Sequence, residues 1–233
     1  MLHVSETVNR HRAAFRDRDD AGARLAEFLR QQGAPVGAVI AVPSGGVPVG
    51  RAVGRSFAVP LDVVLVRKLP LPSNPEMGFG AVTLDRHVVL NQEAMDAFGV
   101  SRARAERVID RVLEGLRERR RALSGGRTPV EVAGRHIVVV DDGLATGVTM
   151  QAALGELRQK GPAGLSVAVP DAPLGTLYNV EPLADEVYCL LAQRGGSFAV
   201  ASFYEHWYDM SDAEVAEMLS DFSAEEGPPD AER

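Results

Sequence analysis

The sequence predicts an α/β fold in which helices flank a mostly parallel β-sheet. Short, continuous apolar runs recur along the chain, as expected of strands that are buried on both faces of such a sheet. Segments with helical character separate these runs, and this alternation is typical of parallel strands joined by crossover helices. The chain has 233 residues, of which 45% are hydrophobic and 24% charged, so it can form one sizeable core. We expect a single domain over residues 1–222.

The first elements follow from apolar spacing and from turn residues. Leu25, Phe28 and Leu29 recur at helical spacing, and Asp19 and Asp20 precede them in the position of an N-cap. The elements expected up to residue 66 are a helix over 21–32, a buried strand over 39–42, a turn over 43–46, a helix over 47–57 and a second buried strand over 61–66.

A segment rich in proline and glycine follows the second strand. Residues 67–80 read RKLPLPSNPEMGFG and contain three prolines and two glycines. These residues disfavour both a helix and a central strand. We therefore expect a long, flexible loop over 67–80.

The second half of the chain continues the alternation of strands and helices. A basic run at 119–121 lies near the end of a long helix, where cations suit the macrodipole, so we interpret it as a solvated helix end rather than a phosphate site. The polar, proline-bearing end of the chain favours a disordered tail. The expected elements are a hairpin over 81–84 and 87–90, a helix over 101–123, a strand over 137–140, a helix over 149–160, a strand over 165–169, a helix over 173–179, a strand over 186–190 and a tail over 223–233.

Charge and composition narrow the expected partners. The formal net charge of −7 argues against nucleic acid and anionic membranes, which favour basic surfaces. We see neither a signal peptide nor the roughly 20 apolar residues that span a bilayer, so we expect a cytoplasmic protein. Cys189 is the only cysteine and lies in an apolar run, which favours a buried thiol.

The run at 137–150, IVVVDDGLATGVTM, combines two kinds of recognition. Four apolar residues predict a strand that delivers Asp141 and Asp142, whose carboxylates can accept hydrogen bonds from neighbouring hydroxyls. Glycines and the start of a helix follow, and their N–H groups favour an anion. Vicinal hydroxyls and a phosphate together describe a phosphorylated sugar. The alternative is a capped strand-to-helix turn with two solvated aspartates.

This run resembles the phosphoribosyl pyrophosphate (PRPP) motif of type I phosphoribosyltransferases. The resemblance implies that Asp141 and Asp142 contact the ribose 2′ and 3′ hydroxyls. It also implies the family fold, with a flexible loop over 67–80 and a small hood built from 171–180 and 198–210. The residues expected at the 5′-phosphate are Ala145, Thr146, Gly147, Val148 and Thr149.

The family also needs a second anion site for the pyrophosphate of PRPP. Ser44, Gly45 and Gly46 follow the first predicted strand, and glycines let backbone N–H groups approach an oxyanion closely. The alternative is a simple turn. Arg67 and Lys68, at the exit of the second strand, are expected to join this site and to stabilise charge on the departing pyrophosphate. Their alternative role is a surface ion pair.

Over residues 10–220 the chain resembles one branch of this superfamily, the stand-alone bacterial phosphoribosyltransferases whose acceptor is unassigned. Three features carry the resemblance. They are Phe15 to Arg18 with Ala21 and Gly22; Arg67 and Lys68 with Asn74, Pro75, Glu76, Gly80 and Ala81; and Phe203 and Tyr204 with Asp212 to Glu214.

The chain departs from the hypoxanthine-guanine branch at Ala145, where those relatives have an aspartate that handles the purine proton. This departure argues against 6-oxopurine salvage and leaves no evident general base in the loop. Glu76 is a conceivable replacement, although a solvated acid is the simpler interpretation. For contact with the acceptor, the candidates are Asp171 and the aromatic segment 203–210, which could instead attach the C-terminal segment to the core.

The resemblance implies a Mg²⁺-assisted displacement of pyrophosphate from PRPP by a nitrogen nucleophile, which we expect to belong to a nucleobase or a similar heterocycle. Arg67, Lys68, Asp141 and Asp142 are the expected catalytic residues, and the two aspartates would contact the metal only indirectly. A PRPP sensor without catalysis, or a transcriptional regulator, is the competing function. The resemblance leaves a homodimer open.

Overall fold

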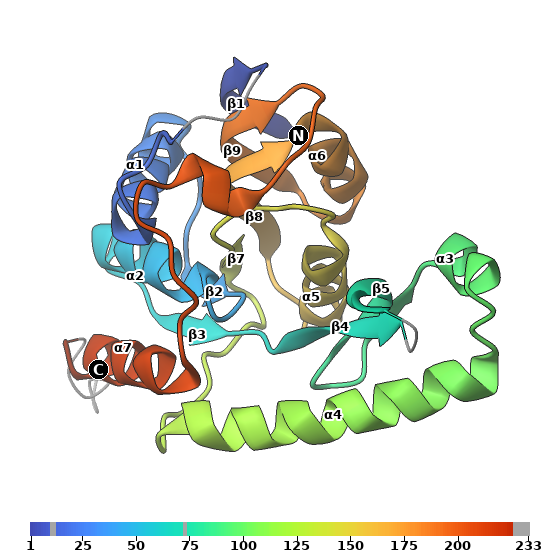
Figure 1. Cartoon of the computed structure of the whole chain (residues 1–233). Coiled ribbons are helices and arrows are strands. Elements are labelled where there is room, and N and C mark those ends of the chain that lie inside the picture. The colour runs from blue at the N-terminus through green and yellow to red at the C-terminus, as the bar shows by residue number, and fades with distance from the viewer. Residues whose placement is uncertain (10–12, 72–73, 226–233) are drawn as a thin grey trace.

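The computed structural model describes residues 1–9, 13–71 and 74–225. Its larger sheet has six strands, all paired in parallel, in the order β1-β9-β8-β7-β2-β3 (Figure 1). This agrees with the predicted α/β fold class. The strands are β1 (Leu2–Val8), β2 (Ala38–Ala41), β3 (Leu61–Val63), β7 (His136–Val140), β8 (Gly164–Pro173) and β9 (Glu186–Gln193).

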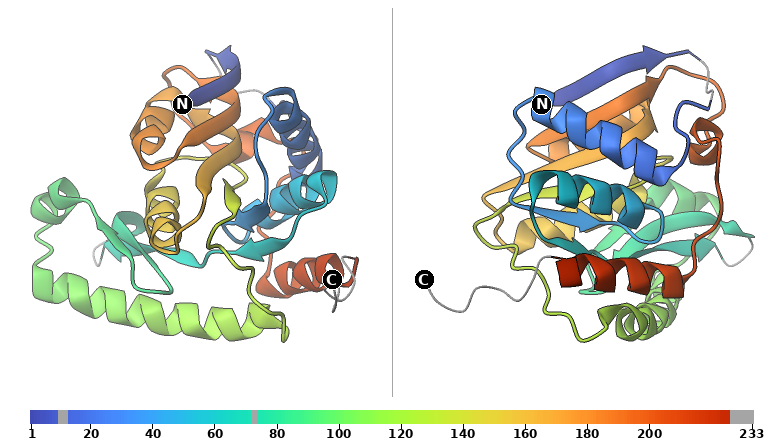
Figure 2. Two further views of the ribbon diagram at one scale, coloured as in Figure 1. Left: turned by 180° about the vertical axis from the view of Figure 1, so that it is seen from behind. Right: turned by 90° about the vertical axis from the view of Figure 1, so that its left-hand side faces the viewer.

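Helices cover both faces of this sheet, as alternating strands and helices require. The helices are α1 (Arg18–Gln31), α2 (Gly46–Phe57), α3 (Gln92–Ala97), α4 (Arg102–Ser124), α5 (Val148–Gln159), α6 (Leu174–Val180) and α7 (Asp212–Glu225), with short 3-10 turns at Glu181–Leu183 and Val200–Phe203. Apolar side chains of α1 and α2 pack on one face, and those of α5 and α6 pack on the other. The helices therefore lie on both faces of the sheet (Figure 2), and two hydrophobic cores pack beneath them.

A smaller antiparallel sheet extends from the main one toward α4. Its order is β4-β5-β6, formed by β4 (Val66–Leu71), β5 (Asn74–Thr83) and β6 (Val88–Leu90). The predicted hairpin over 81–90 is confirmed by the pairing of β5 with β6. α4 packs against this sheet and against α7, which lies alongside the end of α4 nearest the main sheet (Figure 1).

The prediction of an irregular loop over 67–80 was wrong, because β4 and β5 cover most of it. Pro70 is tolerated because β4 is an edge strand, where a missing N–H costs no ladder bond. The pairing register shifts on both sides of Pro70, which accommodates the ring. Whether this segment moves during function stays a prediction, and Pro72 and Ser73 lie outside the described residues.

Other boundaries also differ from the prediction. The side chain of Asp17, rather than Asp19 or Asp20, caps α1 by accepting a hydrogen bond from the N–H of Asp20 at 2.8 Å. β1, α3 and α7 were not predicted. The predicted tail over 223–233 begins inside α7, which extends to Glu225, and residues 226–233 lie outside the described part. None of the described helices is long and apolar enough to cross a membrane.

Candidate functional site

The loop after β7 begins the candidate site, at the carboxyl edge of the parallel sheet. Asp141 and Asp142 leave the strand there, and the N–H of Asp142 donates to Asp141 Oδ1 at 2.9 Å. The loop then reaches Gly147, whose φ of 75° is a left-handed conformation that favours glycine. Gly147 is the N-cap of α5, so the following N–H groups point out of the helix start.

The segment predicted to hold a phosphate is open. Ala145 and Thr146 are exposed, and no hydrogen bond among the described residues uses the N–H groups of 145–149. The hydroxyl of Thr176 in α6 donates to the carbonyl of Ala145 at 2.8 Å, which supports the loop from behind. Five unused donors at a helix start form a favourable position for an oxyanion.

The turn after β2 packs directly against the two aspartates. A Cβ atom on Gly45 would overlap the carboxylate of Asp142, and one on Gly46 would lie 2.8 Å from the carbonyl oxygen of Val140 and 3.0 Å from Asp141 Cα. Only glycine fits at these positions. The structure therefore brings together the two loops that the sequence predicted for the ribose phosphate and for the pyrophosphate.

Two N–H groups in this turn also stay available. The N–H groups of Gly46 and Val47 donate within the turn, to the carbonyls of Val42 and Ser44. No hydrogen bond among the described residues uses the N–H groups of Ser44 and Gly45. A second position for an oxyanion thus adjoins Asp141 and Asp142.

Arg18, at the start of α1, forms the central electrostatic contact of this site. Its Nε donates to Asp142 Oδ2 at 2.8 Å, and its Nη1 donates to the carbonyl of Tyr208 at 2.9 Å. The guanidinium also lies 3.9 Å from the centre of the Trp207 ring, within cation–π range. The sequence pattern predicted no role for Arg18 in the site. The stretch from Phe15 to Arg18 was named only as one of the features that the chain shares with the stand-alone bacterial phosphoribosyltransferases.

The segment 203–210 is attached to the core rather than free. Tyr204 is buried, and its hydroxyl donates to the carbonyl of Asp142 at 2.6 Å. Trp207 packs between Arg18 and the Tyr204 ring. Tyr208 keeps 53% of its surface exposed. These aromatic residues were candidates either for contact with the acceptor or for attachment of the C-terminal segment to the core. The contacts in the structure are those of attachment to the core. The hood stays a prediction.

The two aspartates of the loop experience different electrostatic environments. Burial raises the pKa of Asp141 well above its ordinary value, and the charge of Asp142 raises it further. Burial also raises the pKa of Asp142, but Arg18 opposes that shift through its charge and its hydrogen bond. Arg18 therefore favours the ionised form of Asp142, the carboxylate against which Gly45 packs.

Asp171 is a third buried acid near this edge. It lies inside β8, which continues to Pro173, beyond the end of the strand predicted over 165–169. Its side chain is fully buried, and neither carboxylate oxygen has a hydrogen-bond partner among the described residues. Gly143 provides the necessary space, since a Cβ there would lie 2.7 Å from Asp171 Oδ1. Burial, with the charges of Asp142 and Asp141, raises the pKa of Asp171 well above its ordinary value.

Arg67 lies beside α4 in this structure. It lines a cavity of about 330 Å³ together with residues of α4 and Asp212 of α7, and one of these residues, Arg119, also contacts Ser44. A Cβ on Gly115 would lie 3.2 Å from Arg67 Nη1, so the guanidinium rests against α4. Lys68 is exposed and, by strand alternation, lies on the opposite face of β4. Their predicted catalytic role stays a prediction.

Arg119 corrects our interpretation of the basic run at 119–121. It is not a solvated helix end, because only 14% of its side chain is exposed. Its Nε donates to Asp212 Oδ1 at 2.8 Å, and its Nη2 donates to the hydroxyl of Ser44 at 2.7 Å. Residue pattern alone did not reveal this contact, because α4 and the turn after β2 are far apart in the chain.

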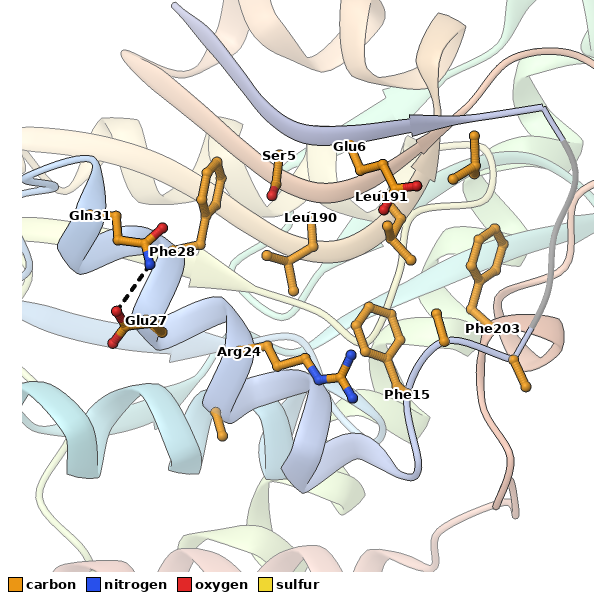
Figure 3. A pocket seen from close by; sticks show the side chains of 14 residues that line it. Ser5, Glu6, Phe15, Arg24, Glu27, Phe28, Gln31, Leu190, Leu191 and Phe203 are labelled. Atoms are coloured by element: carbon orange, nitrogen blue, oxygen red, sulfur yellow. Dashed lines mark hydrogen bonds between the residues drawn. The ribbon is translucent and has the colours of Figure 1, made fainter.

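A second cavity, of about 720 Å³, lies between β1 and α1 with β9 as its floor (Figure 3). Its floor is apolar, and its rim carries Arg24, Glu27 and Gln31 from α1. Phe15 and Phe203 form one wall. Phe203 belongs to the aromatic segment 203–210 considered for the acceptor, but none of the residues predicted to bind PRPP lines this cavity. Within the described residues, no group of three or more His, Cys, Asp or Glu side chains could hold a metal ion.

A protein family and several known proteins resemble this chain. The model of the phosphoribosyl transferase domain family matches residues 14–189. A Mycobacterium tuberculosis protein named "Putative phosphoribosyl transferase Rv0571c" is 39% identical over 205 residues, which are 88% of this chain and 46% of that protein. The chain thus spans about half the length of this relative.

Two further matches differ in extent. The crystal structure of TT1426 from Thermus thermophilus superposes with a TM-score of 0.74 at 37% identity, covering 89% of this chain and 98% of that one. The "Bifunctional protein PyrR 1" of Lactiplantibacillus plantarum is 48% identical, but over only 48 residues, 20% of this chain and 27% of that protein.

Proposed function

The chain belongs to the phosphoribosyl transferase domain family, and on that basis we propose that it transfers the 5-phosphoribosyl group of PRPP to a nitrogenous base or a similar acceptor, with release of pyrophosphate. Family membership supports PRPP-dependent transfer in general. The observation that carries the proposal is the packing of Gly45 and Gly46 against Asp142 and Asp141. It joins two oxyanion positions to an acid pair at one edge of the sheet.

The ribose 5-phosphate would bind at the loop after β7. Asp141 and Asp142 would accept hydrogen bonds from the ribose hydroxyls, and the N–H groups of 145–149 would surround the 5′-phosphate. Arg18 would hold the Asp142 carboxylate ionised and in place. Tyr204 would support the backbone at the same residue.

Pyrophosphate would bind at the turn after β2. The N–H groups of Ser44 and Gly45 are available donors there, and Arg67 and Lys68 would have to approach from β4 to stabilise its charge. In the reaction the bond from ribose C1 to the pyrophosphate oxygen breaks, that oxygen keeps the electron pair, and the acceptor nitrogen forms the new bond and loses its proton. The main contributions of the protein are positioning and stabilisation of charge.

Mg²⁺ fits this donor set, because carboxylate oxygens are the ligands it prefers. Asp141 and Asp142 would hold it through its water molecules, and when bound it would neutralise charge on the pyrophosphate. Ala145 supplies no acid at the position where the hypoxanthine-guanine branch has one. We therefore propose an acceptor other than a 6-oxopurine.

One observation favours a second function, binding of PRPP without transfer. Arg67 rests against Gly115 of α4, and no hydrogen bond or ion pair among the described residues joins it to either loop, although the cavity that it lines also contains Arg119. A PRPP sensor would require only the two loops.

Release of pyrophosphate distinguishes the two functions. The protein is incubated with PRPP and Mg²⁺ against a panel of purine, pyrimidine and related heterocycles, and PRPP binding is measured by calorimetry in parallel. Turnover with any acceptor supports transfer. Tight binding of PRPP without turnover across the panel supports the sensor.

A double variant tests the site itself. Asp141→Asn with Asp142→Asn should weaken PRPP binding by at least about tenfold, since it removes two charged hydrogen-bond acceptors. Asp96→Asn, on α3, is the matched control and should leave the affinity unchanged. Unchanged affinity in the double variant would show that the acid pair is not the ribose site.

A further inference from the structure

We infer that Arg119 is a positioning residue for the pyrophosphate end of PRPP, acting through Ser44. The inference rests on the proposed function and adds a residue that the sequence pattern placed outside the site. Arg119 belongs to α4, and Ser44 belongs to the turn after β2, with 75 positions between them in the chain. Only the fold brings the two side chains together.

The turn at 44–46 is held from two sides. On one side its glycines pack against Asp141 and Asp142, where a side chain would not fit. On the other side the guanidinium of Arg119 donates to the Ser44 hydroxyl at 2.7 Å. The available N–H groups of Ser44 and Gly45 belong to the turn that makes both contacts. Their direction toward an oxyanion therefore depends on both.

The side chain of Arg119 is also held in place by Asp212. Asp212, at the start of α7, accepts from Arg119 Nε at 2.8 Å and lies 2.7 Å from its Nη2. The planar guanidinium has a rigid set of donors, so a carboxylate on one edge sets the direction of the remaining N–H groups. Apolar residues of α4, including Leu116 and Leu123, are buried in the core and hold the helix that carries it.

The position of Arg119 predicts that its loss affects the binding of some ligands and not of others. It supports the turn after β2, but none of its hydrogen bonds or ion pairs among the described residues reaches the loop at 141–149. A loss of Arg119 should thus affect ligands that have a pyrophosphate group and spare ribose 5-phosphate. A purely structural role would affect all of them alike, because a loosened fold disturbs both loops.

Calorimetric titration of the full chain with three probes, each in the presence of Mg²⁺, tests this. The probes are PRPP, pyrophosphate and ribose 5-phosphate. Arg119→Ala should raise the dissociation constants of PRPP and pyrophosphate about tenfold, because the turn that presents the N–H groups of Ser44 and Gly45 is no longer held in place, and leave that of ribose 5-phosphate unchanged. Arg119→Lys should recover only part of the loss, since an ammonium lacks the guanidinium fork.

Two further variants complete the design. Asp212→Asn removes the charge that directs Arg119 but keeps one acceptor oxygen and the arginine, so it should show the same selectivity with a smaller change. Arg117→Ala, an exposed arginine of the same helix, is the matched control and should leave all three dissociation constants unchanged. If Arg119→Ala fails to fold, Asp212→Asn and Arg119→Lys provide the same selective readout.

Equal weakening of all three probes in the Arg119 and Asp212 variants, or no change in any, would overturn the inference. If the unmodified protein binds ribose 5-phosphate and PRPP, and the variants have the same dissociation constants as the unmodified protein, the inference alone fails. If the unmodified protein binds none of the three probes, the proposed function fails and the inference fails with it.

Discussion

Arg18 and Asp142 form a buried ion pair at the carboxyl edge of the sheet, with 2.8 Å between Nε and Oδ2 and with 8% and 13% of their side chains exposed. The pair connects the first turn of α1 to the loop after β7. Removing one member of a buried pair leaves an uncompensated charge in the interior. The site therefore depends on a residue more than 120 positions away from the motif itself.

Replacement of Arg18 should destabilise the fold as well as the site. Arg18→Met keeps much of the apolar stem but leaves Asp142 unpaired, which typically costs roughly 3–5 kcal/mol. Urea unfolding should show a lower midpoint, and PRPP affinity should fall. Arg24→Ala is the control, since its pair with Asp20 is largely exposed and should be worth less than about 1 kcal/mol. Equal losses in the two variants would contradict the assigned importance of the buried pair.

Asp171 should make the stability of the protein depend on pH. Its pKa in the folded state is raised above the unfolded value of 3.8, so the native state holds its proton more tightly than the unfolded chain does. Its contribution to stability is complete below the unfolded pKa and is lost as the pH rises through the folded pKa. The effect of substitution must therefore grow with pH.

Asp171→Asn cannot ionise and should escape this loss. We expect its melting temperature, relative to that of the unmodified protein, to be higher at pH 8 than at pH 5. Thermal unfolding at both values measures the difference. Asp110→Asn, an exposed acid on α4, should give the same relative melting temperature at both. If the difference in melting temperature between Asp171→Asn and the unmodified protein is the same at both pH values, the pKa of Asp171 is not raised in the folded state.

Tyr204 should contribute to the site through its hydroxyl. Tyr204→Phe removes the donor to the Asp142 carbonyl and leaves a part-buried acceptor without that partner, which costs roughly 1–3 kcal/mol. The free energy of unfolding should fall by that amount, with a smaller loss of PRPP affinity. Tyr178→Phe, at an exposed tyrosine, should change neither quantity. A Tyr204→Phe variant as stable as the control would contradict the role of this hydrogen bond.

Gly45 should not tolerate even one methyl group. In Gly45→Ala the new Cβ would overlap the Asp142 carboxylate, so either the turn or the aspartate must move, and PRPP and pyrophosphate binding should both be lost. Gly175→Ala in α6 is the control, because a Cβ there meets no atom within 4 Å. Calorimetry with the two ligands measures the effect. Retained binding in Gly45→Ala would indicate that the close packing of the two loops is dispensable.

Local pattern was sufficient for much of the architecture. The α/β class, the central strands and the loop at 141–149 could be predicted because apolar runs, glycines and acids determine the local structure of the segments in which they occur. The same local logic failed at 67–80, where prolines argued against strands but the edge position of β4 accommodates Pro70. It also failed for β1, which pairs along its length with β9, a partner near the other end of the chain.

The chain by itself therefore determined the acid pair, the two glycine-rich turns and the order of the elements around them. Only the tertiary structure decided what surrounds Asp142: Arg18 and Tyr204 from opposite ends of the chain, and Gly45 from the next strand. It likewise placed Arg119 on Ser44 and directed Arg67 toward α4. The reason is physical, because ion pairs and close packing depend on distance in space, whereas residue spacing reports only on distance along the chain.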